Sequence, residues 1–334
     1  MSKDHKILLL YQPENESCKR FVLALQRSLR EWDVALAEVT LTNLMFQTRK
    51  ADLTHFFLPP SAKSFPLVRT IAGKTKMLQT LLAAPEKPED YRNVLLARQV
   101  VVFSHQEKSI LGRYATEIQV EVIPPCVDLP DPSSLQASSK VREIYAVEDR
   151  MLVISLSDVS NRKSFDAFLY VTREYNRRGG FRFLIPHYRS DKETTLWRDR
   201  LQEAIRLEKL NCASLLDEPV DIHSLLDSAD FAVHMERKPD PEFSCSLHAL
   251  EALCMGKPVI CFNIAPLNEV IREIKARWVA NNIEDVVRES RDLKKQQAEL
   301  EQISTELSRA AKGRLSAEIA ASSYGDLYNR LLAV

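Results

Sequence analysis

The side chains best suited to redox or metal chemistry in this sequence are its six cysteines. No two of them have the C-x-x-C spacing that is typical of redox motifs and of many zinc sites. Cys254 and Cys261 lie in an apolar stretch, where a thiol is usually buried and inert. We therefore expect no metal site, and we expect reduced, buried thiols in a cytoplasmic protein; the six are Cys18, Cys126, Cys212, Cys245, Cys254 and Cys261.

Phosphate binding is the second chemistry to consider, and the supply of glycine limits it. Only 7 of the 334 residues are glycine, whereas average proteins contain about 7%. Sites for sugar nucleotides and dinucleotides usually rely on glycine, because its backbone N–H groups can approach phosphates closely. The chain has little material for loops of that kind.

The charge balance excludes one class of partner. Lys+Arg and Asp+Glu both number 46, so the basic excess of a broad nucleic-acid interface is missing. A local basic pocket for a phosphate stays compatible with this balance. Only four apolar residues follow Lys6, and no apolar run approaches the roughly 20 residues of a membrane span, so we expect neither a signal peptide nor a spanning helix. Peripheral membrane contact stays open.

The elements that must position any site alternate in type along the first part of the chain. Short apolar runs predict strands buried on both faces, and stretches with helical spacing lie between them. This alternation predicts parallel βαβ units. The expected strands are 6–11, 34–39, 52–58, 75–82, 100–103 and 120–123, and the expected helices lie near 17–31, 66–72, 88–97 and 105–115.

A proline-rich stretch from Pro124 to Ser134 is the best candidate for a domain boundary, and a second alternating series follows it. A polar, charge-rich stretch from 283 to 311 predicts a solvated helix rather than a coiled coil. The expected strands of this part are 151–156, 181–185, 212–216, 231–234 and 258–262, and the expected helices are 163–178, 191–209, 222–228 and 246–255. We predict three parts: 1–130, 145–312 and 313–334.

Two stretches resemble the family-4 (group 1) nucleotide-sugar glycosyltransferases. Residues 100–129 are similar to the end of that family's first domain, where a strand runs into an "IPPGVD" turn, with Cys126 at the usual glycine. Residues 250–260 read LEALCMGKPVI, close to the family's "lEAmAcGkPVi". The resemblance implies a GT-B fold. This fold has two Rossmann-like domains, each a mostly parallel sheet flanked by helices, and a C-terminal helix that crosses back to the first domain.

The resemblance also implies roles for individual residues. The helix that begins near Ser246 would point its N-terminus at the donor's phosphates, with Ser244, Ser246 and Leu247 at the site. Glu251 would accept hydrogen bonds from the nucleotide ribose, unless it is an ordinary exposed helix glutamate. Lys163 occupies the lysine position of the family's "GRLxxxKG" loop, where cations stabilise the departing diphosphate. Arg162 beside it would assist, unless it is only an exposed cation at a helix start.

The sequence departs from the family at chemically demanding positions. Asp158 replaces the arginine of the "GRLxxxKG" loop, where an anion would repel phosphate. The first glutamate of the family's E-x7-E pair is Phe243 here, with Glu242 one position away. Leu82 stands at the histidine of the T-x-H motif that lines the acceptor site. His55 matches another family histidine position, although a single histidine at a strand end is more often structural.

The resemblance implies a retaining, metal-independent hexosyl transfer from a nucleoside-diphosphate sugar to a glycan, lipid or small molecule, with no cofactor. Lys163 and Glu242 are the predicted catalytic residues, and His234 is a further residue from which a divergent enzyme could rebuild its site. The alternative is a catalytically silent relative that binds a partner through 283–311. A sugar-nucleotide epimerase of the same fold ranks last, since its usual carboxylate and histidine set is missing.

Overall fold

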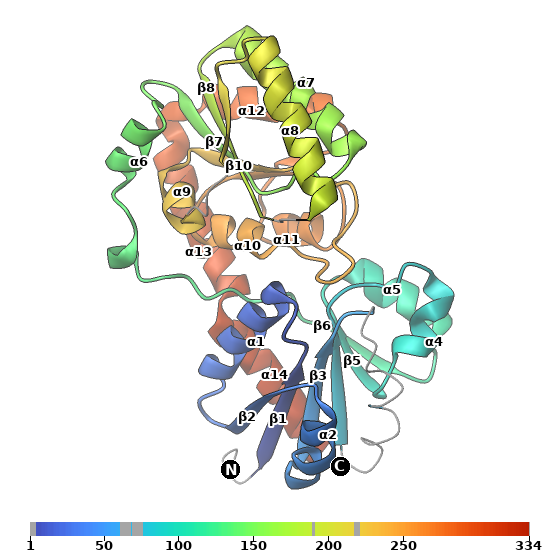
Figure 1. The fold of residues 1–334 in the computed structure, drawn as a ribbon. Helices are drawn as coiled ribbons and strands as arrows, with labels where there is room; N and C mark the ends of the chain where they lie inside the picture. The colour runs from blue at the N-terminus through green and yellow to red at the C-terminus, as the bar shows by residue number, and fades with distance from the viewer. Residues whose placement is uncertain (1–4, 61–67, 69–75, 189–190, 217–220, 334) are drawn as a thin grey trace. The chain divides into compact units, whose positions relative to one another are not determined.

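A computed structural model describes residues 5–60, 68, 76–188, 191–216 and 221–333. The chain divides into two compact units, whose elements are labelled in Figure 1. Unit 1 consists of residues 1–128, 239–247 and 313–334, and unit 2 consists of residues 129–238 and 248–312. The division differs from the expected one in two places. Residues 129–144 belong to unit 2, and the loop 239–247 belongs to unit 1.

Unit 1 is built on a six-stranded sheet in which every strand pair is parallel. Each strand lies within two residues of its predicted position, and β1, β3 and β5 are buried along almost their whole length, as short apolar runs predict. The order is β2-β1-β3-β4-β5-β6, with β1 Lys6–Tyr11, β2 Asp33–Glu38, β3 Leu53–Leu58, β4 Lys76–Leu81, β5 Gln99–Val102 and β6 Gln119–Val122.

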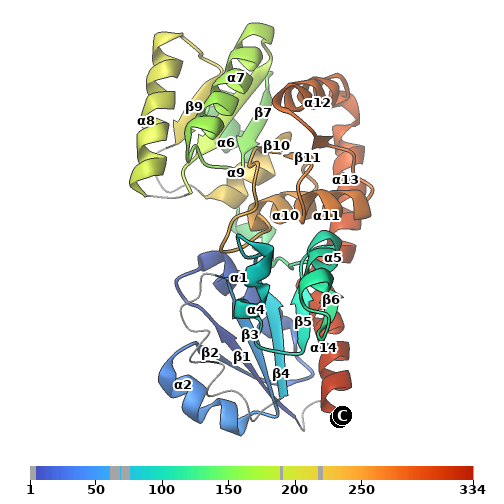
Figure 2. The ribbon, with the colours of Figure 1, turned by 90° about the vertical axis from the view of Figure 1, so that its right-hand side faces the viewer.

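The two faces of this sheet are covered by different helices, as alternation of side chains along β3 requires. Phe56 and Leu58 point into a core that also contains residues of α2 (Leu41–Phe46), α4 (Tyr91–Val94) and α5 (His105–Tyr114). His55 and Phe57 point to the opposite face, where they contact α14 (Ala317–Leu332) and α1 (Glu16–Ser28). Figure 2 shows α14 running alongside this sheet. The helix expected near 66–72 lies largely outside the described residues.

His55 is a core residue that joins the sheet to α14. It is fully buried, with Nδ1 2.8 Å from the hydroxyl of Tyr328 and Nε2 2.8 Å from Oγ1 of Thr80. Thr80 Oγ1 in turn lies 3.1 Å from the hydroxyl of Tyr324. Burial holds the pKa of His55 well below its usual value of 6.5. The structure therefore supports a structural role for His55 and not a role as a site histidine of the resembled family.

This network predicts a stability that falls in mild acid. The unfolded chain protonates His55 near its usual pKa of 6.5, whereas the folded chain resists protonation, so stability is complete above that pH and is lost as pH falls below it. Linkage sets the expected loss between pH 7.5 and 5.5 at about 1.4 kcal/mol. Urea unfolding of the wild type and of His55→Gln at both pH values measures it. Equal pH dependence in the two proteins would contradict a buried neutral histidine.

Unit 2 contains a second six-stranded parallel sheet. Its order is β9-β8-β7-β10-β11-β12, which is the 3-2-1-4-5-6 order of a Rossmann sheet. The short strand β12 was not predicted, since a two-residue strand leaves no pattern. The bounds are β7 Met151–Ser155, β8 Phe181–Pro186, β9 Ala213–Leu216, β10 Phe231–His234, β11 Val259–Phe262 and β12 Val279–Ala280. Two Rossmann-like sheets flanked by helices confirm the predicted fold class.

The helices of unit 2 connect these parallel strands. α7 (Arg162–Arg178) contacts α8 (Lys192–Leu207) and α12 (Ile283–Lys295), and it ends at Gly179, where φ is +68° (Figure 2). α6 (Ser138–Ile144) packs against α9 (Ile222–Ser228). The remaining helical segments within the described residues are α10 Leu247–Cys254, α11 Leu267–Glu273 and α13 Leu300–Leu315, with short 3-10 turns at Thr48–Lys50, Pro88–Asp90, Pro132–Ser134 and Gln297–Glu299.

The polar stretch 283–311 forms two helices with a buried side each, so the prediction of a single solvated helix is wrong. Ser290 in α12 lies 2.6 Å from the hydroxyl of Tyr175, inside unit 2. A Cβ placed on Gly256 would come within 2.5 Å of the backbone oxygen of Ser304, so α13 packs directly on the turn after α10. Scattered apolar residues were enough to bury one face of each helix; they include Val286, Val287, Leu293, Leu307 and Ala311.

All six cysteines are buried, and none is part of a disulfide. Burial raises the pKa of the Cys18, Cys254 and Cys261 thiols to about 12. A thiol with so high a pKa is not a nucleophile at neutral pH. The structure therefore confirms the expected inert, buried thiols.

Candidate functional site

The carboxyl ends of β7 and β10 form the topological switch point of unit 2, because the chain winds outward in opposite directions from these two strands. Open α/β sheets bind ligands at such a point. The hydroxyl of Ser157 accepts a hydrogen bond of 2.8 Å from the backbone N–H of Met235, which ties the two strand ends together. α7 and α10 both begin just beyond these ends. Their N-termini therefore lie at the same edge of the sheet.

Asp158, which follows β7, has a structural contact. It is buried, and its Oδ1 accepts a hydrogen bond of 3.2 Å from the backbone N–H of Tyr188, just after β8. The Tyr188 hydroxyl donates to the backbone oxygen of Ser155 at 2.8 Å, so the loops after β7 and β8 are held together. The side chain of Asp158 therefore has a partner inside unit 2, and the repulsion of phosphate by this carboxylate stays a prediction.

Glu251 lies in the second turn of α10 and is almost fully buried. Ala249, Leu250, Ala252 and Leu253 fix this apolar helix in the core, and that placement carries the glutamate into the interior. Its Oε2 lies 3.0 Å from Nδ1 of His248, three residues earlier on the helix. Since an ionised carboxylate only accepts hydrogen bonds, Nδ1 is the protonated nitrogen in this contact.

A second histidine and a tyrosine also lie close to Glu251. Nε2 of His223, in α9, lies 3.2 Å from Oε2 of Glu251, in a geometry that does not form a hydrogen bond. The ring of Tyr188 lies 5.1 Å from that of His248. Burial raises the pKa of Tyr188 well above 10, with smaller contributions from Asp158 and Glu251. Glu251 is therefore a buried carboxylate held by His248, and the exposed helix glutamate is excluded.

His234 ends β10 close to this cluster. Burial lowers its pKa below 6.5, and the charge of His248 lowers it further, whereas Glu236, with Oε2 3.9 Å from Nε2, acts in the opposite direction. The imidazole is therefore neutral at neutral pH. A neutral imidazole at the switch point can accept or donate a hydrogen bond but cannot neutralise a phosphate.

The predicted cations lie at the start of α7. Asn161 caps this helix by accepting a hydrogen bond from the backbone N–H of Ser164, and the Ser164 hydroxyl accepts one from the backbone N–H of Asn161 in return. Lys163 is exposed, and Arg162 has 81% of its side chain exposed and lies 3.9 Å from Asp166. The ammonium group of Lys163 and the guanidinium group of Arg162 are therefore exposed at the carboxyl edge of the sheet, where an anion would approach the N-terminus of α7.

The loop before α10 lies in unit 1, and Phe243 anchors it. This ring is buried and lies 5.9 Å from the ring of Phe21 and 5.3 Å from that of Phe103. The backbone N–H of Ser244 donates to the oxygen of Leu82 at 2.8 Å, and Asn15 Nδ2 donates to the oxygen of Glu242 at 3.2 Å. Sequence reasoning treated position 243 only as a missing glutamate and did not foresee this anchor.

The predicted site residues are therefore divided between the two units. Glu251, Lys163 and Arg162 belong to unit 2 and lie at its carboxyl edge. The other four belong to unit 1; they are Glu242, Ser244, Ser246 and Leu247. The residues that the prediction missed are His223, His248 and Tyr188. A histidine three residues before Glu251 on a predicted helix was the one signal in the sequence that could have suggested a partner for the carboxylate.

Metal-binding clusters and membrane-spanning helices are absent from the described ranges. No group of three or more His, Cys, Asp or Glu side chains there is arranged to hold a metal ion. None of the helices in those ranges has the length and apolar character needed to cross a bilayer.

Both units together match solved proteins of one fold. The chain resembles a glycosyltransferase from Rickettsia africae ESF-5 with a TM-score of 0.77 and 17% identity, over 98% of each chain. It resembles Anabaena HepE in complex with UDP and glucose with a TM-score of 0.75 and 13% identity, over 98% of this chain and 100% of that one. For sucrose-phosphate synthase from Thermosynechococcus elongatus the TM-score is 0.70 and the identity 14%, over 98% and 99%.

These likenesses identify the fold as GT-B, which confirms the fold expected from the resemblance. No protein-family model matches the chain, and no curated protein matches its sequence. With identities of 13–17%, the neighbours establish the scaffold, and the activity has to be argued from the residues.

Proposed function

We propose that this protein is a glycosyltransferase that moves a sugar from a nucleoside-diphosphate sugar to an acceptor, with retention of configuration and without a metal ion. The observation that carries the proposal is the buried carboxylate of Glu251, oriented by His248 beside the switch point of a Rossmann-like sheet. Anabaena HepE, a structural neighbour, was solved with UDP and with UDP-glucose. A nucleotide-sugar donor is therefore the ligand that fits this scaffold best.

The residues of unit 2 have distinct tasks in this proposal. Glu251 accepts hydrogen bonds from the ribose hydroxyls, and burial makes that contact strong because little water competes for it. When the sugar–phosphate bond breaks, negative charge develops on the leaving diphosphate. Lys163 and Arg162 stabilise that charge, together with the positive end of the α10 helix dipole.

The residues of unit 1 have a smaller part. Ser244 and Ser246 supply hydroxyl donors for phosphate in a chain with few glycines, and Leu247 begins α10. Glu242 is the proposed carboxylate at the sugar. The acceptor is a glycan, a lipid or a small molecule. Buried thiols without disulfides support a cytoplasmic location.

A panel of UDP-, GDP- and ADP-sugars tests the proposal by calorimetry and thermal unfolding. One donor class should bind with measurable heat, and at ten times its Kd it should stabilise the protein by about 1.4 kcal/mol. The other bases should give a smaller effect. A protein that shows neither heat nor stabilisation with any of them is not a sugar-nucleotide enzyme.

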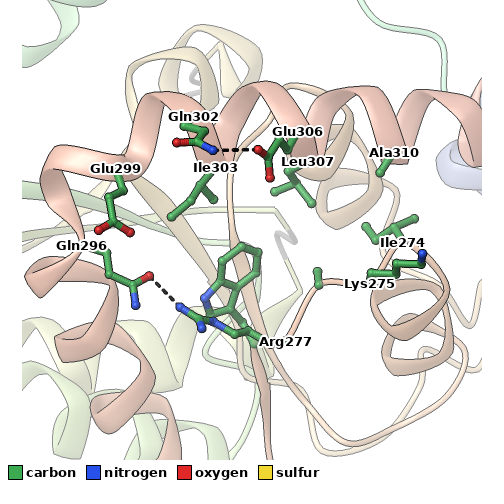
Figure 3. Close-up of a pocket in the computed structure, with 12 residues that line it drawn as sticks. Ile274, Lys275, Arg277, Gln296, Glu299, Gln302, Ile303, Glu306, Leu307 and Ala310 are labelled. Carbon is green, nitrogen blue, oxygen red and sulfur yellow. Dashed lines mark hydrogen bonds between the residues drawn. The ribbon is translucent and has the colours of Figure 1, made fainter.

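One observation favours a second candidate, a GT-B relative that binds a partner without catalysis. The side chain at the family's first glutamate position is Phe243, which is buried in unit 1. A docking surface for a partner is available in unit 2, where a hollow of about 480 Å³ lies between α13 and the segment after α11 (Figure 3). Its rim carries both signs of charge, from Lys275 and Arg277 on one side and Glu299 and Glu306 on the other. This candidate predicts that a bound donor is neither transferred nor hydrolysed.

A further inference from the structure

A strongly basic groove lies between the ends of α7 and α12 in unit 2, separate from the candidate site. α7 ends where the chain turns into the amino end of β8, whereas the candidate site lies at the carboxyl ends of the strands. The groove encloses about 520 Å³ and is lined by Arg177, Arg178, Gly179, Phe181, Arg291, Lys294 and Lys295.

The lining cations are only partly neutralised. Glu174 accepts hydrogen bonds from Arg177 at 2.8 and 3.0 Å and from Arg178 at 2.9 Å, and Asp292 accepts one from Lys295 at 2.7 Å. Five cations therefore face two bonded carboxylates, which leaves three positive charges. That is a marked local excess in a chain whose formal net charge is zero.

Helix ends attract cations, and this effect accounts for part of the excess. The C-terminus of a helix carries about half a negative charge, so the ends of α7 and α12 together offset roughly one of the three. An excess of about two positive charges remains. The basic residues of this groove are therefore more numerous than helix capping requires.

The groove also has a fixed wall. Lys294 Nζ donates to the backbone oxygen of Gly179 at 3.1 Å and lies 5.2 Å from the centre of the Phe181 ring. It occupies the space beside Gly180, where a Cβ would come within 1.8 Å of Nζ. Lys294 is thus held in place, while the exposed guanidinium of Arg291, one turn earlier on α12, stands beside it on the solvent side.

We propose that this groove binds a phosphate group carrying two negative charges. The excess charge matches a phosphate dianion, and guanidinium groups bind phosphate oxygens with paired, directional hydrogen bonds. The ligand is a soluble phosphate ester or diphosphate, or the headgroup of an anionic phospholipid. This inference is independent of the proposed transferase activity, because it concerns the opposite edge of the sheet.

Calorimetry with inorganic pyrophosphate at low ionic strength tests the proposal, with the wild type compared with Arg177→Gln/Arg291→Gln. The matched control is Lys192→Gln/Arg309→Gln, which removes the same charge from exposed positions of unit 2 outside the groove. The groove variant should lose roughly tenfold or more in affinity, as expected when charged hydrogen bonds are removed, and the control should lose little. Lys163→Gln, which changes the carboxyl edge of the sheet and leaves the groove intact, should bind pyrophosphate in the groove as the wild type does.

Sedimentation with vesicles of phosphatidylcholine, with or without phosphatidic acid, distinguishes the two sources of phosphate, because the headgroup of phosphatidic acid is a phosphomonoester that can carry two negative charges. Binding to the vesicles with phosphatidic acid that is lost in the groove variant identifies a lipid headgroup, and pyrophosphate binding without vesicle binding identifies a soluble ligand. The proposal is overturned if pyrophosphate does not bind, if Lys163→Gln weakens its binding as much as the groove variant does, or if the groove variant and the control bind it equally well.

Discussion

Replacing Phe243 with alanine is expected to lower the free energy of unfolding of unit 1 by about 3–5 kcal/mol, the usual cost of removing a buried phenylalanine. The ring is 4% exposed and contacts Phe21 and Phe103, which also contact each other at 5.7 Å. Its removal leaves a cavity in the core and frees the loop that precedes α10. Hydrogen exchange of peptides from β1 and β3, followed in increasing urea, reports this change for unit 1 alone.

Two further variants make the experiment specific. Phe46→Ala removes the same side chain from a position in α2 that is 60% exposed, and it should change the stability of unit 1 by less than about 0.5 kcal/mol. Phe243→Glu restores the carboxylate of the resembled family, and it should be at least as destabilising as Phe243→Ala because the charge would be buried without a partner. A stable Phe243→Glu protein would show that position 243 does not face the core.

Phe243 also shows where sequence reasoning reached its limit. The sequence around residue 243 resembles the family's E-x7-E motif, in which this position holds a glutamate. The comparison therefore indicates only that the glutamate is missing, and it says nothing about the phenylalanine. Its aromatic partners, Phe21 and Phe103, lie more than 100 residues away in the sequence, and no local periodicity connects them. A contact between distant loops and helices is set by tertiary packing, which spacing alone does not encode.

The strands were predicted well for a physical reason. Val100 to Phe103 and Met151 to Ile154 are continuous apolar runs, and a strand covered by helices on both faces needs such a run. Elements that depend on their surroundings were missed. The helix α11 begins after Pro266 without a side-chain cap, and α6 follows a loop that resembled a domain linker. The flanking motif singles out Glu251 in the sequence, whereas no motif indicates its histidine neighbours, His223 and His248.

Burial also decides the contacts of Asp158 and His55, and for His55 it confirms the structural interpretation that is more usual for a histidine at a strand end. Both are polar residues that a sequence pattern can assign either to a ligand or to the interior. Asp158 accepts a hydrogen bond from Tyr188, and His55 has a hydroxyl at each ring nitrogen. Buried polar groups must find such partners, but the partners become visible only when the strands are aligned in space.

Glu251→Gln is expected to weaken binding of the preferred nucleoside diphosphate by roughly 10- to 150-fold, which corresponds to the 1.5–3 kcal/mol of a hydrogen bond to a charged group. The same contact should make the wild type prefer UDP, or the diphosphate of the preferred base, over its 2′,3′-dideoxy analogue. Glu251→Gln should lose most of that preference. Glu301→Gln, an equal change of charge at an exposed position on α13, is the control.

The histidine partner gives a sharper form of the same test. Because His248 Nδ1 donates to Glu251 at 3.0 Å, His248→Asn keeps a side-chain N–H in nearly the same place, whereas His248→Leu removes it. The asparagine variant should retain the preference for the ribose hydroxyls, and the leucine variant should lose most of it while the protein stays folded. If both variants discriminate like the wild type, His248 does not orient the carboxylate. If Glu251→Gln also discriminates normally, the ribose is bound elsewhere, and the buried glutamate serves only the packing of α10 against α9.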